Sequence, residues 1–157
     1  MSITTQHVYI IVEGPSDQLI LSSIFDGVFD EHVKIHYYVA HGVSGIVSST
    51  RPIMDLVDTD VKIVVVYDAD TSDELRAEER NDFIKSQILN GQNDERLLFV
   101  YFVPTIDQSH VFLSECARNK RKARDEYNAK VSEFIKHHKN DFLKIEQIKQ
   151  IVEFVNK

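Results

Sequence analysis

The chain has 157 residues, of which 43% are hydrophobic and 27% are charged, and this composition is that of a single folded globular domain. Its 25 acidic residues outnumber its 18 lysines and arginines, and the resulting net charge of −7 argues against a protein that coats nucleic acid by charge alone. No apolar run is long enough to cross a bilayer, the first residues do not resemble a signal peptide, and the single Cys116 cannot form an internal disulfide. We therefore expect a cytoplasmic protein.

The N-terminal part of the chain predicts a strand followed by a helix. The apolar, β-branched run at 8–12 is typical of a buried strand. Gly14 and Pro15 predict a turn, and Ser16 is a suitable N-cap for a helix over about 17–29. In that helix, apolar residues recur at helical spacing at Leu19, Ile20, Ile24 and Val28.

The alternation of strand and helix continues along the chain. Further strands are predicted at 33–40, 61–67 and 97–103. A helix over about 45–57 follows the second strand and has to accommodate Pro52, while Thr71 or Ser72 can cap a polar helix after the third strand. This order predicts an α/β fold with a four-stranded, mostly parallel sheet and helices on both faces.

The C-terminal part has a different pattern. Residues 109–138 are predicted to be helical but polar, and Asn140 can cap a final helix. An apolar stripe runs along that final helix, at Ile145, Ile148, Ile151, Val152 and Val155. We expect one domain over 1–157, in which an α/β core at about 7–115 carries a helical extension at about 116–157.

Acidic residues stand where two of the predicted strands end. Glu13 follows the first strand, while Asp68 and Asp70 follow the third. The carboxyl ends of parallel strands meet at one edge of a sheet, and two acids spaced two apart face the same side where the chain is extended. Carboxylate oxygens are the ligands that Mg²⁺ prefers, and a bound cation can activate water beside a phosphate. The pattern predicts a Mg²⁺ or Mn²⁺ site for phosphate chemistry.

These residues resemble a known family. The sequence Val-Glu-Gly-Pro-Ser-Asp at 12–17, followed by Tyr-Asp-Ala-Asp at 67–70, is similar to the Toprim domain of topoisomerases, bacterial primases, RNA-maturation nucleases and OLD-family nucleases. The resemblance covers about 7–115, and the turn at 41–45 is similar to that of OLD-like members. It implies a Toprim or Rossmann-like fold, with Glu13 as general acid/base or metal ligand and Asp68 and Asp70 as magnesium ligands.

The resemblance also implies less specific site residues. Gly14 would permit the tight turn after the first strand. Asp17 matches an acid found in many members; it either helps to bind a second ion or is an ordinary acid of the first helical turn, where it favours the helix dipole. Many members of the family follow the Asp-x-Asp pair with a small residue and glycine, whereas this chain has Thr71, Ser72 and Asp73. Asp73 either joins the metal ligands or starts a helix, where an acid favours the helix dipole.

Substrate contacts are predicted in two places. His41 and Ser44, in the turn after the second strand, are candidate phosphate contacts, although a surface histidine in a turn is the more common situation. A basic block is a candidate contact for the phosphate backbone, although a solvated helix face is the more common situation. That block comprises Arg118, Lys120, Arg121, Lys122 and Arg124.

The leading hypothesis for function is Mg²⁺- or Mn²⁺-dependent hydrolysis of phosphodiester bonds in DNA or RNA. A topoisomerase would need a tyrosine nucleophile on a further domain, and a primase would need template-binding domains. The chain has no phosphate-binding Gly-x-x-x-x-Gly-Lys-Ser/Thr loop. Besides nucleic acid, the partners to consider are therefore an ATPase acting in trans and a second copy of the chain.

Two other functions stay open from the sequence. The stretch from Asp68 to Thr71 also resembles the Asp-x-Asp-x-Thr strand end of haloacid-dehalogenase-type phosphatases, in which Asp68 would be the nucleophile and Asp70 the acid/base. Alternatively, a Toprim-like fold can keep its metal site for binding alone and act as a regulatory or nucleic-acid-sensing subunit. The acidic net charge of the chain agrees with this binding role.

Overall fold

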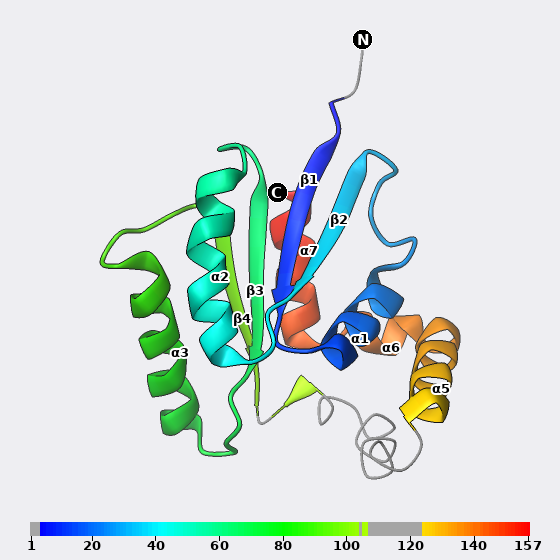
Figure 1. Ribbon diagram of the computed structural model, residues 1–157. Helices are drawn as coiled ribbons and strands as arrows, with labels where there is room; N and C mark the ends of the chain where they lie inside the picture. Colours follow the sequence, from blue (N-terminus) through cyan, green and yellow to red (C-terminus); the bar gives the residue numbers. More distant parts are fainter. Residues whose placement is uncertain (1–3, 104, 107–123) are drawn as a thin grey trace.

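A parallel sheet forms the centre of the protein. The computed structural model describes residues 4–103, 105–106 and 124–157. Within these residues, the strands lie in the order β2-β1-β3-β4, and all neighbours pair in parallel (Figure 1). This confirms the predicted α/β class and is consistent with a Toprim or Rossmann-like arrangement. The strands are β1 (Gln6–Val12), β2 (Val33–Val39), β3 (Lys62–Asp68) and β4 (Leu97–Phe102).

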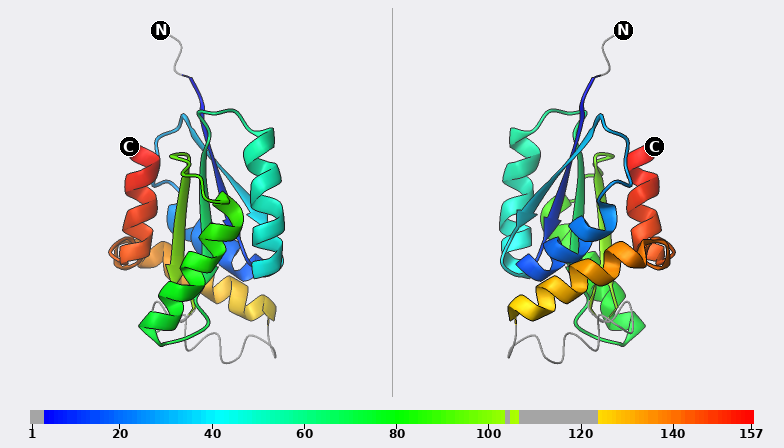
Figure 2. Two further views of the ribbon diagram at one scale, coloured as in Figure 1. Left: turned by 90° about the vertical axis from the view of Figure 1, so that its left-hand side faces the viewer. Right: turned by 90° about the vertical axis from the view of Figure 1, so that its right-hand side faces the viewer.

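Helices cover both faces of this sheet, as the side views in Figure 2 show. One face packs against α2 (Val43–Leu56) and α3 (Glu74–Leu89), and the other packs against α1 (Pro15–Phe25) and the C-terminal helices. The central strand β3 is buried on both sides because its residues alternate: Val64 and Val66 belong to the core beside α1, while Val65 and Tyr67 belong to the core beside α2 and α3.

The C-terminal helices complete the core beside α1. They are α5 (Arg124–His137), α6 (Lys139–Leu143) and α7 (Glu146–Asn156). The predicted apolar stripe is confirmed at Ile148, Ile151 and Val155, which are buried against the sheet. Lys62 in β3 caps the C-terminal end of α7, because its Nζ donates to the carbonyls of Phe154 and Val155 at 2.8 and 3.0 Å. The helices predicted as an extension therefore form a layer of the α/β core.

Three predicted helix starts are wrong. The N-cap of α1 is Gly14 rather than Ser16, because Pro15 takes the first helical position, where its missing N–H is not needed. The N-cap of α3 is Asp73, whose side chain accepts from the N–H of Arg76 at 3.1 Å, rather than Thr71 or Ser72. Asn140 lies inside α6, so it does not cap the final helix, which begins after Ile145.

Other boundaries differ by a few residues. Helix α1 ends at Phe25, earlier than expected, and α2 begins at Val43 and continues through Pro52. No helix in the described part of the chain is long and apolar enough to span a membrane.

Candidate functional site at the carboxyl edge of the sheet

The structure brings Glu13 and Asp68 together. Glu13 directly follows β1, Asp68 is the last residue of β3, and these two strands are paired neighbours. Glu13 Oε1 accepts a hydrogen bond from the backbone N–H of Asp68 at 2.7 Å. The carboxyl ends of the strands lie at the lower edge of the sheet in Figure 1. Ligands of open α/β sheets bind at this edge, so the contact lies where a functional site is expected.

Asp68 is held in a setting that disfavours its charge. Its Oδ1 accepts from the N–H of Ile106, just beyond β4, at 2.7 Å. Burial is the main cause that raises the pKa of Asp68 to about 8, and the negative charges of Asp17, Glu13 and Asp70 add to the rise. The Ile106 hydrogen bond opposes this rise without cancelling it. Near neutral pH, and without a neighbouring cation, Asp68 therefore holds a proton for much of the time.

The pKa of Glu13 is shifted in the same direction. Burial raises it above its ordinary value, and the charges of Asp70 and Asp17 contribute. The hydrogen bond from Asp68 N–H and the positive charge of Arg80 lower it, but the net shift is upward. Glu13, Asp17, Asp68 and Asp70 thus influence one another electrostatically, and we call these four residues the acidic cluster.

Asp17 has a structural role as well as a charge in this cluster. It is in the first turn of α1, and its Oδ2 accepts from the N–H of Gly14 at 2.9 Å, which closes the start of the helix. Gly14 itself has φ −146°, which any residue can adopt, and an added Cβ would meet only Asp17 Oδ2, at 3.6 Å. Gly14 permits this turn, but the turn does not require a conformation that only glycine adopts.

Asp70 lies in a turn rather than in an extended segment. Strand β3 ends at Asp68, and Asp70 has φ +56°, a left-handed conformation that is uncommon outside glycine. The prediction that Asp70 faces the same side as Asp68 assumed an extended chain, and the chain is not extended at Asp70. Its Oδ2 instead pairs with Arg80 Nη2 at 3.1 Å, while Arg80 Nε donates to the carbonyl of Asp68 at 3.3 Å.

Arg80 is the residue of this site that the sequence patterns did not reveal. It is on α3, ten residues after Asp70, and no local motif connects the two. The only signal is helical spacing: the buried residues Ala77, Asn81 and Ile84 mark the face of α3 that meets the sheet, and Arg80 is at the border of that face.

The turn after β2 lies beside Glu13. The N–H of Gly42 donates to the carbonyl of Glu13 at 3.0 Å, and Gly42 has φ +103°, which favours glycine. An added Cβ on Gly45 would lie 1.7 Å from the carbonyl oxygen of Ala40, so only glycine allows this close approach. Of the predicted phosphate contacts, His41 is exposed in this turn, and Ser44 is exposed in the first turn of α2.

Two other predictions have different outcomes. Asp73 is exposed and caps α3, which is the helix-start role weighed for it from the sequence. The basic residues Arg118, Lys120 and Arg121, with Lys122, lie outside the described residues, as does Cys116. The same is true of the side chain of Arg124, although its backbone begins α5.

The donors of the acidic cluster suit a hard dication in type. Mg²⁺ binds carboxylate oxygens, commonly only one or two of them with several waters, and Glu13 and Asp68 are adjacent. In the described side chains, no three His, Cys, Asp or Glu residues are already arranged as a group that could hold a metal ion. Asp70 is turned to Arg80, and one oxygen of Asp17 is used by Gly14 N–H. A cation would therefore bind first at Glu13 and Asp68.

Comparison with known proteins provides no family for the chain. No protein-family model matches it, and no curated protein matches it with significance. Its function therefore has to be inferred from the acidic cluster itself.

Proposed function

We propose that the protein is a Mg²⁺- or Mn²⁺-dependent phosphodiesterase that acts on nucleic acid, with a Toprim-type site. One observation carries this proposal: Glu13 Oε1 accepts from the N–H of Asp68 at the carboxyl edge of the sheet, and the charges of Asp17 and Asp70 reach both carboxyls. Four acids in this arrangement repel one another. A divalent cation reverses the local sign, so the cluster favours binding one.

The acids have different roles in this proposal. The cation binds first at Glu13 and Asp68, and Asp70 joins them as a ligand when it leaves Arg80, with Asp17 at the edge of the cluster. Because the pKa of Asp68 is about 8, its carboxyl has to release a proton before it can act as a ligand, so cation binding strengthens as the pH rises. The raised pKa of Glu13 suits this residue to exchange a proton with water or with the leaving oxygen closer to neutral pH. When bound, the cation would polarise the phosphoryl group and lower the pKa of a water molecule.

The test is cleavage of supercoiled plasmid, single-stranded DNA and structured RNA with Mg²⁺ or Mn²⁺. We expect activity that EDTA abolishes and that falls by about a hundredfold or more in Glu13→Gln and in Asp68→Asn. Asp60→Asn is the matched control, because Asp60 is an exposed acid just before β3, at the opposite edge of the sheet. The proposal is wrong if all four proteins cleave equally, because the activity would then belong to a contaminant.

Other outcomes identify the alternatives. Hydrolysis of p-nitrophenyl phosphate without nucleic-acid cleavage would identify a phosphatase that uses Asp68 and Asp70. Mn²⁺ binding without turnover, together with a stable complex with an ATPase or another protein, would identify a binding subunit. Size-exclusion chromatography with light scattering, on the same samples, tests the homodimer.

A further inference from the structure

We propose that Arg80 is a phosphate-binding residue of the site, and that it changes partner from Asp70 to a phosphate oxygen of the substrate when a cation binds. This inference rests on the proposed function, because it assumes that a divalent cation enters the acidic cluster. It assigns to α3 a role in substrate binding for which the sequence patterns gave no indication.

The contacts of Arg80 bring the positive charge of its guanidinium to the acidic cluster. Its Nη2 is 3.1 Å from Asp70 Oδ2, and its Nε donates to the backbone carbonyl of Asp68 at 3.3 Å. Its positive charge also lowers the pKa of Glu13. Arg80 is therefore near three of the four acids, at the end of β3, where the phosphate of a substrate would have to lie.

The pair with Asp70 can be broken easily. The side chain of Arg80 is 33% exposed and that of Asp70 is 56% exposed, and ion pairs at this level of exposure are weak because water competes for both charges. A divalent cation bound at Glu13 and Asp68 would attract the same Asp70 carboxylate and compete with the guanidinium for it. Asp70 is therefore the partner that Arg80 would lose.

Release from Asp70 would leave the guanidinium in a useful position. The bond from Nε to the Asp68 carbonyl does not involve Asp70, so it can keep the group at the strand end. A guanidinium presents its N–H groups as a rigid fork that fits two oxygens of a phosphate, whereas a lysine ammonium is a point charge. The chain as a whole carries a net charge of −7, so a local cation beside the acids would help a polyanion to approach.

The test measures two affinities in the full chain. Mn²⁺ binding is measured by calorimetry with the metal alone, and binding of a fluorescent 20-nucleotide single strand is measured by anisotropy in Ca²⁺, with the strand checked for integrity on a gel. Arg76→Gln is the matched control, because Arg76 is exposed on the same helix, one turn before Arg80. The test variants are Arg80→Gln and Arg80→Lys.

We expect the two affinities to change in opposite directions. Arg80→Gln should bind Mn²⁺ about threefold more tightly, because Asp70 no longer has a competing partner. It should bind the oligonucleotide about tenfold more weakly, because charge-assisted hydrogen bonds to phosphate are lost. Arg80→Lys should keep the Mn²⁺ affinity of the natural protein but still bind the oligonucleotide more weakly, and Arg76→Gln should change both affinities less than twofold.

Each contrary result has a distinct meaning. If Arg80→Gln and Arg76→Gln behave alike in both assays, Arg80 only forms a surface ion pair and the inference is wrong, even if the protein cleaves nucleic acid. If Arg80→Gln weakens Mn²⁺ binding, Arg80 supports the acids rather than competing for them. If the natural protein binds no Mn²⁺, both this inference and the proposed function are overturned. Arg80→Lys keeps the test decisive if the glutamine variant does not fold.

Discussion

Two aspartates at opposite edges of the sheet have opposite electrostatic surroundings. Asp94, in the loop before β4, accepts from Arg96, and this hydrogen bond is the main cause that lowers the pKa of Asp94 below its ordinary value. Asp68, at the far end of β3, has its pKa raised to about 8, mainly by burial. The same residue type is thus stabilised as an anion at one edge and disfavoured as an anion at the other.

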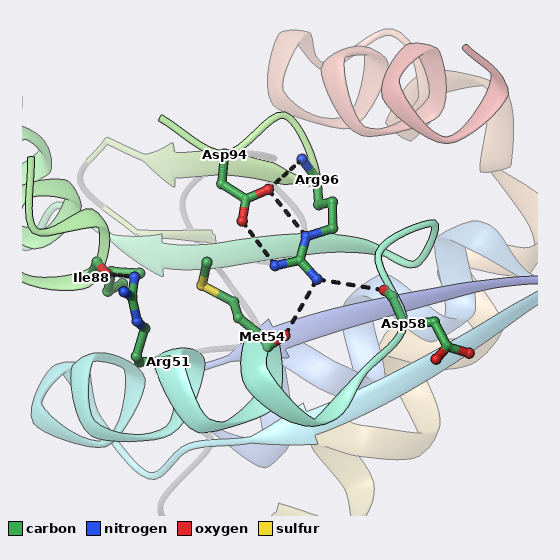
Figure 3. Close-up of polar contacts among 6 residues, drawn as sticks. All are labelled: Arg51, Met54, Asp58, Ile88, Asp94 and Arg96. Carbon is green, nitrogen blue, oxygen red and sulfur yellow. Dashed lines mark hydrogen bonds and ion pairs between the residues drawn. The ribbon is translucent and has the colours of Figure 1, made fainter. Parts of the chain in front are cut away.

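The edge near Asp94 is built for stability. Figure 3 shows the Arg96 guanidinium between Asp94 and the end of α2: Nη2 is 2.9 Å from Asp94 Oδ2, and Nη1 donates to the carbonyl of Met54 at 3.3 Å. Arg51 makes a similar link between helices, from α2 to the carbonyl of Ile88 in α3, at 3.3 Å. Arginines therefore satisfy the carbonyls near the ends of both helices, where the helix dipole favours positive charge.

The edge near Asp68 lacks this balance. Its acids receive backbone N–H groups from Asp68, Gly14 and Ile106, while Arg80 forms an ion pair with Asp70 and donates to the carbonyl of Asp68. Acids whose charged form is disfavoured in the folded protein lower the free energy of unfolding. Natural proteins tolerate such regions chiefly where function requires them. The contrast supports the proposal that the carboxyl edge binds a ligand, whereas the contacts at the amino edge stabilise the fold.

Removing Arg96 should have the largest effect on stability. We expect Arg96→Met to lower the free energy of unfolding by about 2–3 kcal/mol, because a partly buried Asp94 loses its charge-assisted bonds and the Met54 carbonyl loses a donor. Urea unfolding followed by circular dichroism measures this. The exposed Arg76→Met is the control, and it should stay within about 0.5 kcal/mol. Equal effects from both variants would show that the amino edge has no special role in stability.

The same substitution at the two aspartates should have opposite signs. Asp68→Asn at pH 7.5 should raise the free energy of unfolding by about 1–2 kcal/mol, because the amide removes a disfavoured charge and still accepts from Ile106 N–H. The value is modest because water still reaches this carboxyl. Asp94→Asn should lower the free energy of unfolding by about 1–2 kcal/mol because it breaks the pair with Arg96. Two changes of the same sign in urea unfolding would remove the contrast between the edges.

Much of this fold follows from the sequence. The strands at 8–12 and 61–67 were predictable because apolar β-branched runs that end at acids leave little ambiguity, and their parallel pairing brings Glu13 to Asp68. Helix starts were less predictable, because several capping residues stand next to each other: Pro15 determines the start of α1 over Ser16, and Asp73 caps α3 in place of Ser72.

From the sequence, only those features of the site that follow from the order of the strands could be predicted. The left-handed turn at Asp70 and its pair with Arg80 depend on how α3 packs on the sheet. No local sequence pattern predicts that packing. The role of Gly45 was hidden for the same reason, because its need for glycine comes from the carbonyl of Ala40 and not from its own backbone angle.

The two edges should also differ in the pH range where they affect stability. The pKa of Asp68 is raised in the folded state, so its contribution is full below its ordinary value of 3.8 and is lost as the pH rises through about 8. Asp94 has a lowered pKa, so its contribution is present above 3.8 and is lost only at more acidic pH. Between pH 5.5 and 7.5, these pKa values correspond to a fall in the free energy of unfolding of about 2.5 kcal/mol through Asp68. Because water still reaches this carboxyl, we expect a fall of about 1 kcal/mol.

Urea unfolding at these two pH values measures this difference. His36, whose pKa is lowered, acts with the opposite sign near pH 6.5, so the quantity to compare is the natural protein minus Asp68→Asn. A pH dependence that is identical in both proteins would show that the charge of Asp68 is not disfavoured in the folded state.

The smallest expected effect is the response to Mn²⁺, and it should sharpen the contrast most directly. At pH 8, a free Mn²⁺ concentration a few times the dissociation constant should raise the free energy of unfolding by about 0.5–1 kcal/mol, because the cation binds the folded state. At pH 5.5 the effect should be smaller, because Asp68 keeps its proton and is a poor ligand. Asp94→Asn should respond like the natural protein, whereas Asp68→Asn should not respond. If Asp68→Asn responded to Mn²⁺ as strongly as the natural protein, the cation would be binding elsewhere, and the unbalanced charge at the carboxyl edge would need another explanation.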